Sequence, residues 1–407
     1  MNLNVFRLRG EYPGQYWLLF WGYLISTVGA SMIWPFFTIY VSENLGLPLT
    51  AVASLMTINA VTGLAFSFFS GPLVDRAGRK WIMVASLVIS GLVYFFYSRA
   101  GSLLEFAVLQ AIAGAFNPLY RVAADAMMAD LIPPERRIDA YSLMRLGHNV
   151  GVAIGPAVGG FIASTSYTVA FYFAMTGMIL FGLLVAVFGK ETLPQKAETP
   201  GMFGGYDRVL RDRTFMLFAV NFTLTQTASA ILWVLLAVYV KQNFGIPENM
   251  YGLLPTTNAV MVLLLQLWIT RQTKHYAPLK VLGVGTFIYA VALGSIAIGQ
   301  GFWAFWGSMV LFTVGEMILM PTSTTYTANL APADMRGRYM SIYTLTWGAA
   351  SGIGPVLGGF LNDNLGARSP WIGGLVIGLV SAAGFVLLAR RSGGAPLRRL
   401  PVDEPTP

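Results

Sequence analysis

The strongest constraint on the fold is a series of apolar stretches, each long enough to cross a lipid bilayer as a helix. A hydrocarbon core about 30 Å thick requires about 20 mainly apolar residues. Twelve such stretches lie between turn signals, at residues 16–41, 49–74, 81–98, 103–130, 139–164, 168–189, 214–240, 250–270, 280–299, 302–329, 339–362 and 370–390. Only 11% of the 407 residues are charged, against about 25% in soluble proteins. We therefore predict an all-α membrane protein with twelve transmembrane helices.

The distribution of positive charge predicts the orientation of these helices. If both termini are cytoplasmic, 21 of the 26 Lys and Arg residues fall in segments on the cytoplasmic side, as expected for a membrane protein. The net charge of +8 therefore requires no nucleic-acid partner. We expect a multi-pass protein of the inner (plasma) membrane, surrounded by lipid, with both termini in the cytoplasm.

A polar segment and an internal repeat predict two halves. Residues 190–213, rich in Pro and Gly, form a cytoplasmic linker between bundles at 1–189 and 214–391, and residues 392–407 are expected to be a disordered cytoplasmic tail. A shift of 199 residues aligns 129–161 with 328–360, and 12 of these 33 positions are identical. We predict two pseudo-symmetric six-helix bundles with a substrate site at their interface, near the bilayer midplane.

The loop between the second and third predicted helices carries a specific motif. It reads Gly71-Pro-Leu-Val-Asp75-Arg76-Ala-Gly78-Arg79-Lys80 and resembles the signature loop of the major facilitator superfamily, with every fixed position present. The resemblance implies a secondary transporter in which this loop and an acid at the end of helix 4 form a conformational switch. The implied switch residues are Gly71, Asp75, Arg76, Gly78, Arg79, Lys80 and Asp130. The alternative is a static ion-pair cluster that fixes topology.

A second motif lies in the fifth predicted helix. Gly151, Gly155, Pro156, Gly159 and Gly160 resemble the motif of the superfamily's antiporters, which implies antiport. Glycines at every fourth position also give the helix one smooth face, and the simpler interpretation is packing against the other half. The family pattern has an Arg in helix 4, and the corresponding position is expected to hold a glutamine, Gln110.

Ionisable residues inside membrane spans are functional candidates. Arg121 and Asp125 share a face of the fourth helix, and Arg145 and His148 lie near them on the fifth. They could form a proton relay, with Asp125 as the acid, or a salt-bridge cluster that braces the two helices.

Glu316 is the most informative acid because it lies near the middle of the tenth helix, with no basic residue nearby in sequence. A desolvated carboxyl can carry a proton at neutral pH. It resembles the helix-10 acid of some multidrug exporters of the superfamily. It could instead pair with a cationic substrate, or only form a hydrogen bond to another helix.

Aromatic, amide and Met side chains at a similar depth favour a binding cavity for flat, lipophilic and also cationic compounds. The predicted cavity residues are Trp34, Phe37, Gln110, Asn117, Tyr120, Gln226, Trp233, Asn258, Met320 and Trp347.

The sequence excludes several classes of function. It has no Cys, two His and no phosphate-binding loop, so we expect no metal, cofactor, ATP-driven or enzymatic chemistry. The leading hypothesis is a monomeric proton-coupled antiporter that exports small hydrophobic or amphiphilic drugs by alternating access. The alternatives are an uncoupled or symport facilitator for a polar metabolite, sugar or lipid, and a receptor without transport activity.

Overall fold

The computed structural model describes residues 12–133, 136–193, 206–332 and 335–391, and these residues form helices without strands. Residues 194–205 of the predicted linker and the whole predicted tail lie outside the described part. The helices of the first half are α2 (Gly14–Ile33), α3 (Phe37–Leu45), α4 (Leu49–Ala77), α5 (Arg79–Tyr97), α6 (Leu103–Leu131), α7 (Arg137–Ala163) and α8 (Tyr167–Phe188). The short helix α9 (Tyr206–Arg211) precedes the second half, which contains α10 (Arg213–Phe244), α11 (Glu248–Tyr251), α12 (Leu253–Thr273), α13 (Pro278–Ile298), α14 (Gly301–Leu330), α15 (Arg336–Leu365) and α16 (Ser369–Arg391).

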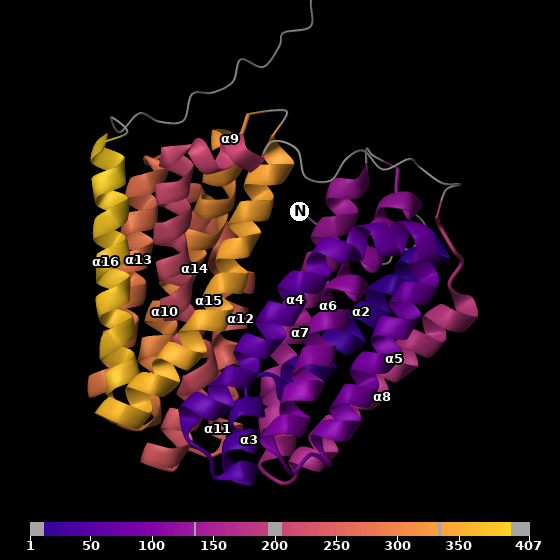
Figure 1. Cartoon of the computed structure of the whole chain (residues 1–407), viewed down its shortest axis with the longest axis horizontal. Coiled ribbons are helices and arrows are strands. Elements are labelled where there is room, and N and C mark those ends of the chain that lie inside the picture. Colours follow the sequence, from indigo (N-terminus) through magenta and orange to yellow (C-terminus); the bar gives the residue numbers. More distant parts are fainter. Residues whose placement is uncertain (1–11, 134–135, 194–205, 333–334, 392–407) are drawn as a thin grey trace, which may run out of the picture.

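The helices form two bundles that stand side by side (Figure 1). The first bundle contains α2 to α8 and the second contains α10 to α16. We call the end of the molecule that carries α9 the linker end, and the opposite end, where α3 and α11 lie, the α11 end. The bundles lie further apart at the linker end than at the α11 end (Figure 1). The predicted all-helical fold with two bundles is confirmed.

Eleven segments of the described chain are long and apolar enough to span a membrane. The predicted span that is missing from this set, 339–362, corresponds to α15, which has 30 residues but a more polar composition. α15 can be more polar than the other spans because part of it faces an internal cavity, which Thr344, Trp347 and Ser351 line.

The first predicted helix, at 16–41, is interrupted in the structure. Three turn residues separate α2 from α3, and the middle one is Pro35, which lacks a backbone N–H and disfavours a continuous helix. The break leaves Trp34 47% exposed, at a position where it lines the cavities between the bundles.

Large apolar side chains cover the outside of the molecule. Phe69, Val187, Leu264 and Trp303 are each more than 60% exposed, which is the pattern expected of a surface in contact with lipid acyl chains.

Candidate functional site: two connected chambers between the bundles

Two large cavities meet between the bundles. The first, which we call the aromatic chamber, has a volume of about 730 Å³ and is lined by residues that include Trp34, Phe37, Asn59, Gln226, Trp233 and Trp347. The second, which we call the basic chamber, has a volume of about 700 Å³ and is lined by residues that include Tyr23, Tyr120, Arg121, Asp125, Arg145 and His148. The chambers are connected, since both are lined by Ala30, Trp34, Ser90, Tyr94, Asn117, Met178 and Trp233.

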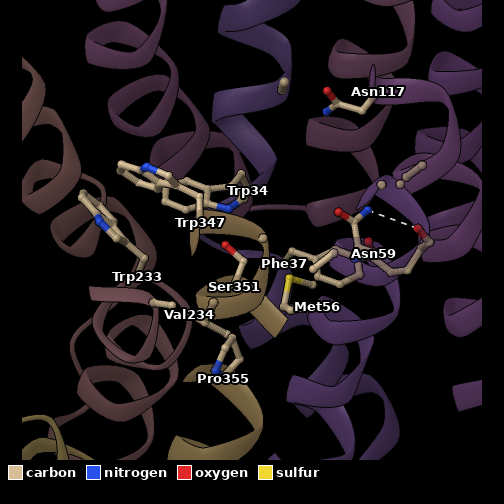
Figure 2. Close-up of a pocket in the computed structure, with 18 of the residues that line it drawn as sticks. Trp34, Phe37, Met56, Asn59, Asn117, Trp233, Val234, Trp347, Ser351 and Pro355 are labelled. Carbon is tan, nitrogen blue, oxygen red and sulfur yellow. Dashed lines mark hydrogen bonds between the residues drawn. The ribbon is translucent and has the colours of Figure 1, made fainter. Parts of the chain in front are cut away.

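Tryptophans from both bundles define the aromatic chamber. The rings of Trp34, at the end of α2, and Trp233, on α10, lie 5.3 Å apart between centroids. Trp347 of α15 lies on the same side of the chamber, and Asn59 and Asn117 lie across from these three rings (Figure 2). Aromatic surfaces opposite amide groups suit a ligand with a large apolar body and few polar groups.

Two glutamines provide buried polar groups in this chamber. Gln226 is only 2% exposed, and its side-chain oxygen has no hydrogen-bond partner. Gln110 is 6% exposed, and its backbone oxygen accepts a hydrogen bond of 3.1 Å from the Asn59 amide. An unsatisfied buried acceptor is costly, so the Gln226 oxygen is a polar group of this lining that the described residues leave without a partner.

The basic chamber gathers the four ionisable residues that the sequence placed in helices 4 and 5. Arg121 and Asp125 reach it from α6, and Arg145 and His148 reach it from α7. His148 Nδ1 is hydrogen-bonded to the Tyr23 hydroxyl at 3.1 Å. Within the described residues, the ion pairs are Arg79–Asp130, Lys241–Glu43 and Lys241–Glu248. Asp125 is therefore not salt-bridged to either arginine, and the predicted salt bridge that would brace the two helices is not formed.

Glu316 lies apart from both chambers. Its carboxylate accepts a hydrogen bond of 2.6 Å from the Asn258 amide, which also donates to the Thr313 hydroxyl at 3.0 Å. These contacts join α12 to α14 inside the second bundle. Among the predicted cavity residues, Asn258 and Met320 are absent from the described lining of both chambers, whereas the other eight line one or both.

The signature loop forms part of the predicted switch. Gly78, between α4 and α5, has a φ of 93°, a backbone conformation that favours glycine. Arg79 forms an ion pair with Asp130 and donates to the Ala126 backbone oxygen at 3.0 Å. The surroundings of Gly71 and the side chain of Asp75 lie outside the described part, so the roles of these two residues stay predictions.

Sequence reasoning missed one partner of this loop, Glu191. Its carboxylate accepts hydrogen bonds of 3.0 Å from the backbone N–H groups of Arg79 and Lys80, at the start of α5. Burial alone would raise the pKa of Glu191, but backbone donors at Leu193, Lys80, Arg79 and Thr192 outweigh burial and hold the pKa below its ordinary value. No local sequence signal predicts this cap, because the acid and the helix that it caps are 112 residues apart.

The glycine motif of α7 packs against both halves, with three of its glycines on α2 of its own bundle and Gly160 on the other bundle. A Cβ on Gly151, Gly155 or Gly159 would come within 2.8 Å of atoms of α2. Gly160 differs, since a Cβ there would lie 2.5 Å from the backbone oxygen of Glu248 in the other bundle. The repeat places Gly359 of α15 in a similar contact, 2.8 Å from the Thr50 backbone. The glycines thus permit close packing both within and between bundles.

Polar contacts at the α11 end join the two bundles, and sequence reasoning missed them. Lys241 of α10 pairs with Glu43 of α3 at 2.6 Å, and the hydroxyl of Tyr167 on α8 donates to Glu248 of α11 at 2.6 Å. Asp363 of α15 accepts hydrogen bonds from the first residues of α4, at 2.8 Å from the Thr50 backbone N–H. These contacts close the α11 end of the molecule.

Comparison with known proteins connects this architecture to one family. The family model of the Major Facilitator Superfamily matches residues 19–228 and 218–406. The chain is 29% identical over 380 residues to the uncharacterized MFS-type transporter YttB of Bacillus subtilis (strain 168), covering 91% of this chain and 94% of that protein. It is 27% identical to a Na⁺, Li⁺, K⁺/H⁺ antiporter of Planococcus maritimus, covering 80% and 84%. It is 24% identical to the multidrug resistance protein MdtH of Escherichia coli O9:H4 (strain HS), covering 92% and 93%.

Solved structures share the fold at low sequence identity. A POT family transporter in complex with 5-aminolevulinic acid aligns with a TM-score of 0.79 at 14% identity, over 93% of this chain and 96% of that one. The nucleoside transporter NupG aligns with a TM-score of 0.77 at 10% identity, over 92% and 100%.

Proposed function

The chain belongs to the Major Facilitator Superfamily, and from this premise we propose that it is a proton-coupled antiporter that exports amphiphilic compounds by alternating access. The observation that carries the proposal is the pair of connected chambers between two bundles that are joined at one end. A site between two halves of this kind can be opened to either side of a membrane by rocking one half against the other. A multidrug resistance protein and a cation/proton antiporter among the relatives support the same class of function.

The proposed orientation places the linker end in the cytoplasm of a bacterial cell and the α11 end outside. The excess of Lys and Arg in the segments at the linker end supports it. In this orientation the structure is the inward-facing state, because the contacts of Lys241, Tyr167 and Asp363 hold the outer end closed. A substrate would enter the chambers from the cytoplasm or the inner leaflet.

Two acids inside the bundles are available for proton exchange. Glu316 is held by Asn258 at a contact between two helices, so a change in its protonation alters a bond between α12 and α14. Asp125 lies in the basic chamber, where its charge acts on any ligand directly. We assign the proton carrier to Glu316 and regard Asp125 as the second candidate.

Transport by reconstituted protein tests the proposal. A compound found by thermal-shift screening is expected to move against its gradient when a pH gradient is imposed, and its movement is expected to drive protons the other way. Glu316→Gln should reduce substrate-driven proton movement at least tenfold, because an amide cannot exchange a proton, whereas the control Asp207→Asn on α9 should not.

Two outcomes would contradict this assignment. If proton movement is unchanged in Glu316→Gln and lost in Asp125→Asn, the proton carrier is Asp125 in the basic chamber and not Glu316. Transport that is indifferent to the pH gradient in the unmodified protein would favour an uncoupled facilitator.

A further inference from the structure

We propose that the basic chamber binds the acidic group of an amphiphilic substrate whose apolar body occupies the aromatic chamber, an inference that rests on the transport function proposed above. The substrate class would then be aromatic or aliphatic acids with one anionic head, such as a carboxylate or a phosphate. The sequence predicts hydrophobic or amphiphilic compounds and includes cationic ones among them, whereas the present proposal specifies an anionic head.

The charges that line the chambers carry this inference. Among the described residues of both linings, the Asp, Glu, Lys and Arg side chains are Arg121, Asp125 and Arg145, which leaves one net positive charge while Asp125 is ionised. Both arginines are exposed to the chamber, and neither is paired with Asp125. Because no carboxylate of the described residues forms an ion pair with either arginine, an incoming anion would gain charge-assisted hydrogen bonds from both guanidinium groups.

The chemistry of arginine matches an acidic head group. A guanidinium group presents its N–H donors in a planar fork that fits a carboxylate or phosphate with two parallel hydrogen bonds. Arg121 of α6 and Arg145 of α7 line the same chamber, so an anion in this chamber has guanidinium groups from two helices around it. The hydroxyls of Tyr23 and Tyr141 belong to side chains of the same lining, which adds neutral polar groups around the head.

The connection between the chambers gives the ligand its two-part character. Trp34 and Trp233 line both chambers. A ligand whose acidic group lies beside the arginines would therefore place its apolar body against these two indole rings. Glu316, for which pairing with a cationic substrate is the alternative to carrying a proton, lines neither chamber within the described residues. A purely cationic ligand would therefore meet a single carboxylate, Asp125, beside two arginines.

The same arrangement gives Asp125 a specific role. Its carboxylate partly neutralises the arginines in the empty chamber and repels an incoming anion. A neutral side chain at this position should therefore improve binding of an acid, and it should weaken binding of an amine. A single variant, Asp125→Asn, therefore distinguishes an acidic substrate from an amine by the direction in which the affinity changes.

A matched set of three fluorescent probes tests the proposal by equilibrium binding to the purified full-length protein in neutral detergent. The probes share an anthracene body: 9-anthracenecarboxylate, 9-anthracenemethanol and 9-(aminomethyl)anthracene. We expect the carboxylate to bind about tenfold more tightly than the alcohol, the gain typical of a charge-assisted hydrogen bond, and the amine to bind most weakly. Arg121→Gln and Arg145→Gln should each remove most of this preference without changing the affinity for the alcohol, and Asp125→Asn should increase the affinity for the carboxylate several-fold.

Controls keep the test decisive. Arg208→Gln, on α9 outside the bundles, removes an exposed arginine and should leave all three affinities unchanged. Arg121→Lys and Arg145→Lys keep the charge without the fork and should retain part of the preference, which provides an answer if a Gln variant fails to fold. Equal binding of the carboxylate and the alcohol, a preference that survives in the double Gln variant, or weaker carboxylate binding in Asp125→Asn would each overturn the proposal.

Nanodiscs separate two sources of the acidic group. If anionic phosphatidylglycerol displaces the carboxylate probe while zwitterionic phosphatidylcholine does not, and if this displacement requires both arginines, the natural ligand is a lipid head group. If neither lipid displaces the probe, the ligand is a soluble acid. Because binding is measured without a membrane gradient, the acid preference can hold even if proton-coupled transport fails, and transport can succeed with probes that show no such preference.

Discussion

At the scale of single residues, the structure shows that charged side chains act over long distances in sequence. Glu191 caps a helix that begins 112 residues earlier in the chain, and Glu316 is held by Asn258, 58 residues away. The sequence placed Glu316 correctly near the middle of a helix. It could not show which way the carboxyl points, because a span that is apolar on all sides has no pattern that distinguishes its cavity face from its bundle face.

The cap formed by Glu191 leads to a prediction about pH. Its pKa lies below the ordinary value, so the folded state favours the charged form. The stabilisation is fully present above the pKa of Glu in the unfolded chain, about 4.3, and is lost as the pH falls through the lower folded value. Glu191→Gln should lower the free energy of unfolding at pH 7 by about 1 kcal/mol or less, as for loss of an N-cap that is partly screened by solvent.

Thermal unfolding at several pH values measures this effect. The difference between the unmodified protein and Glu191→Gln should shrink as the pH is lowered toward 4 and below. A difference that stays constant across this range would mean that the charge of Glu191 does not contribute to the cap.

At the scale of helices, small residues determine how closely the elements approach. The repeat and the spacing of the glycines were visible in the sequence, and they predicted a smooth face on α7. The partner of that face could not be predicted, because one glycine-lined face fits a helix of either bundle. In the structure, Gly159 packs on Met32 of α2, and Gly160 packs on α11.

Two glycine substitutions should have opposite effects on stability. Gly159→Ala would place a Cβ 2.4 Å from the Met32 backbone oxygen, so the helices must separate, and we expect a loss of about 1–3 kcal/mol, as for overpacking. Gly307→Ala on α14 meets no atom within 4 Å and should stabilise the protein by up to about 1 kcal/mol. Thermal unfolding of the two detergent-solubilised variants, heated in parallel with the unmodified protein, measures both changes in stability. A Gly159→Ala variant as stable as Gly307→Ala would contradict the close packing described for α7.

At the scale of the whole molecule, composition alone was sufficient to predict a bundle of transmembrane helices. The number of spans followed from hydropathy except at α15, whose polar face lines the aromatic chamber. The contacts that close the α11 end could not be predicted, since they join residues far apart in the chain, such as Lys241 and Glu43 or, 314 positions apart, Leu49 and Asp363. Pairing of this kind depends on how the bundles are oriented, which one sequence does not specify.

Alternating access requires these contacts to break when the outer end opens. Lys241→Gln removes the ion pair with Glu43 and leaves Glu248, whose side chain is 7% exposed, without its cationic partner. The variant should therefore favour the state that is open at the α11 end. Replacing exposed Glu105 by Gln, at the start of α6 in the first bundle, serves as a control that removes a charge without changing a contact between the bundles.

The most direct test of the account is a pair of distances measured by electron spin resonance. The chain contains no Cys, so spin labels attach only where a Cys is introduced. One pair, Leu47→Cys with Met250→Cys, reports on the α11 end, and another, Lys190→Cys with Lys274→Cys, reports on the linker end. We predict that Lys241→Gln lengthens the first distance and shortens the second. If the two distances change together, or if neither changes, the two bundles do not rock around the chambers and the proposed mechanism is wrong.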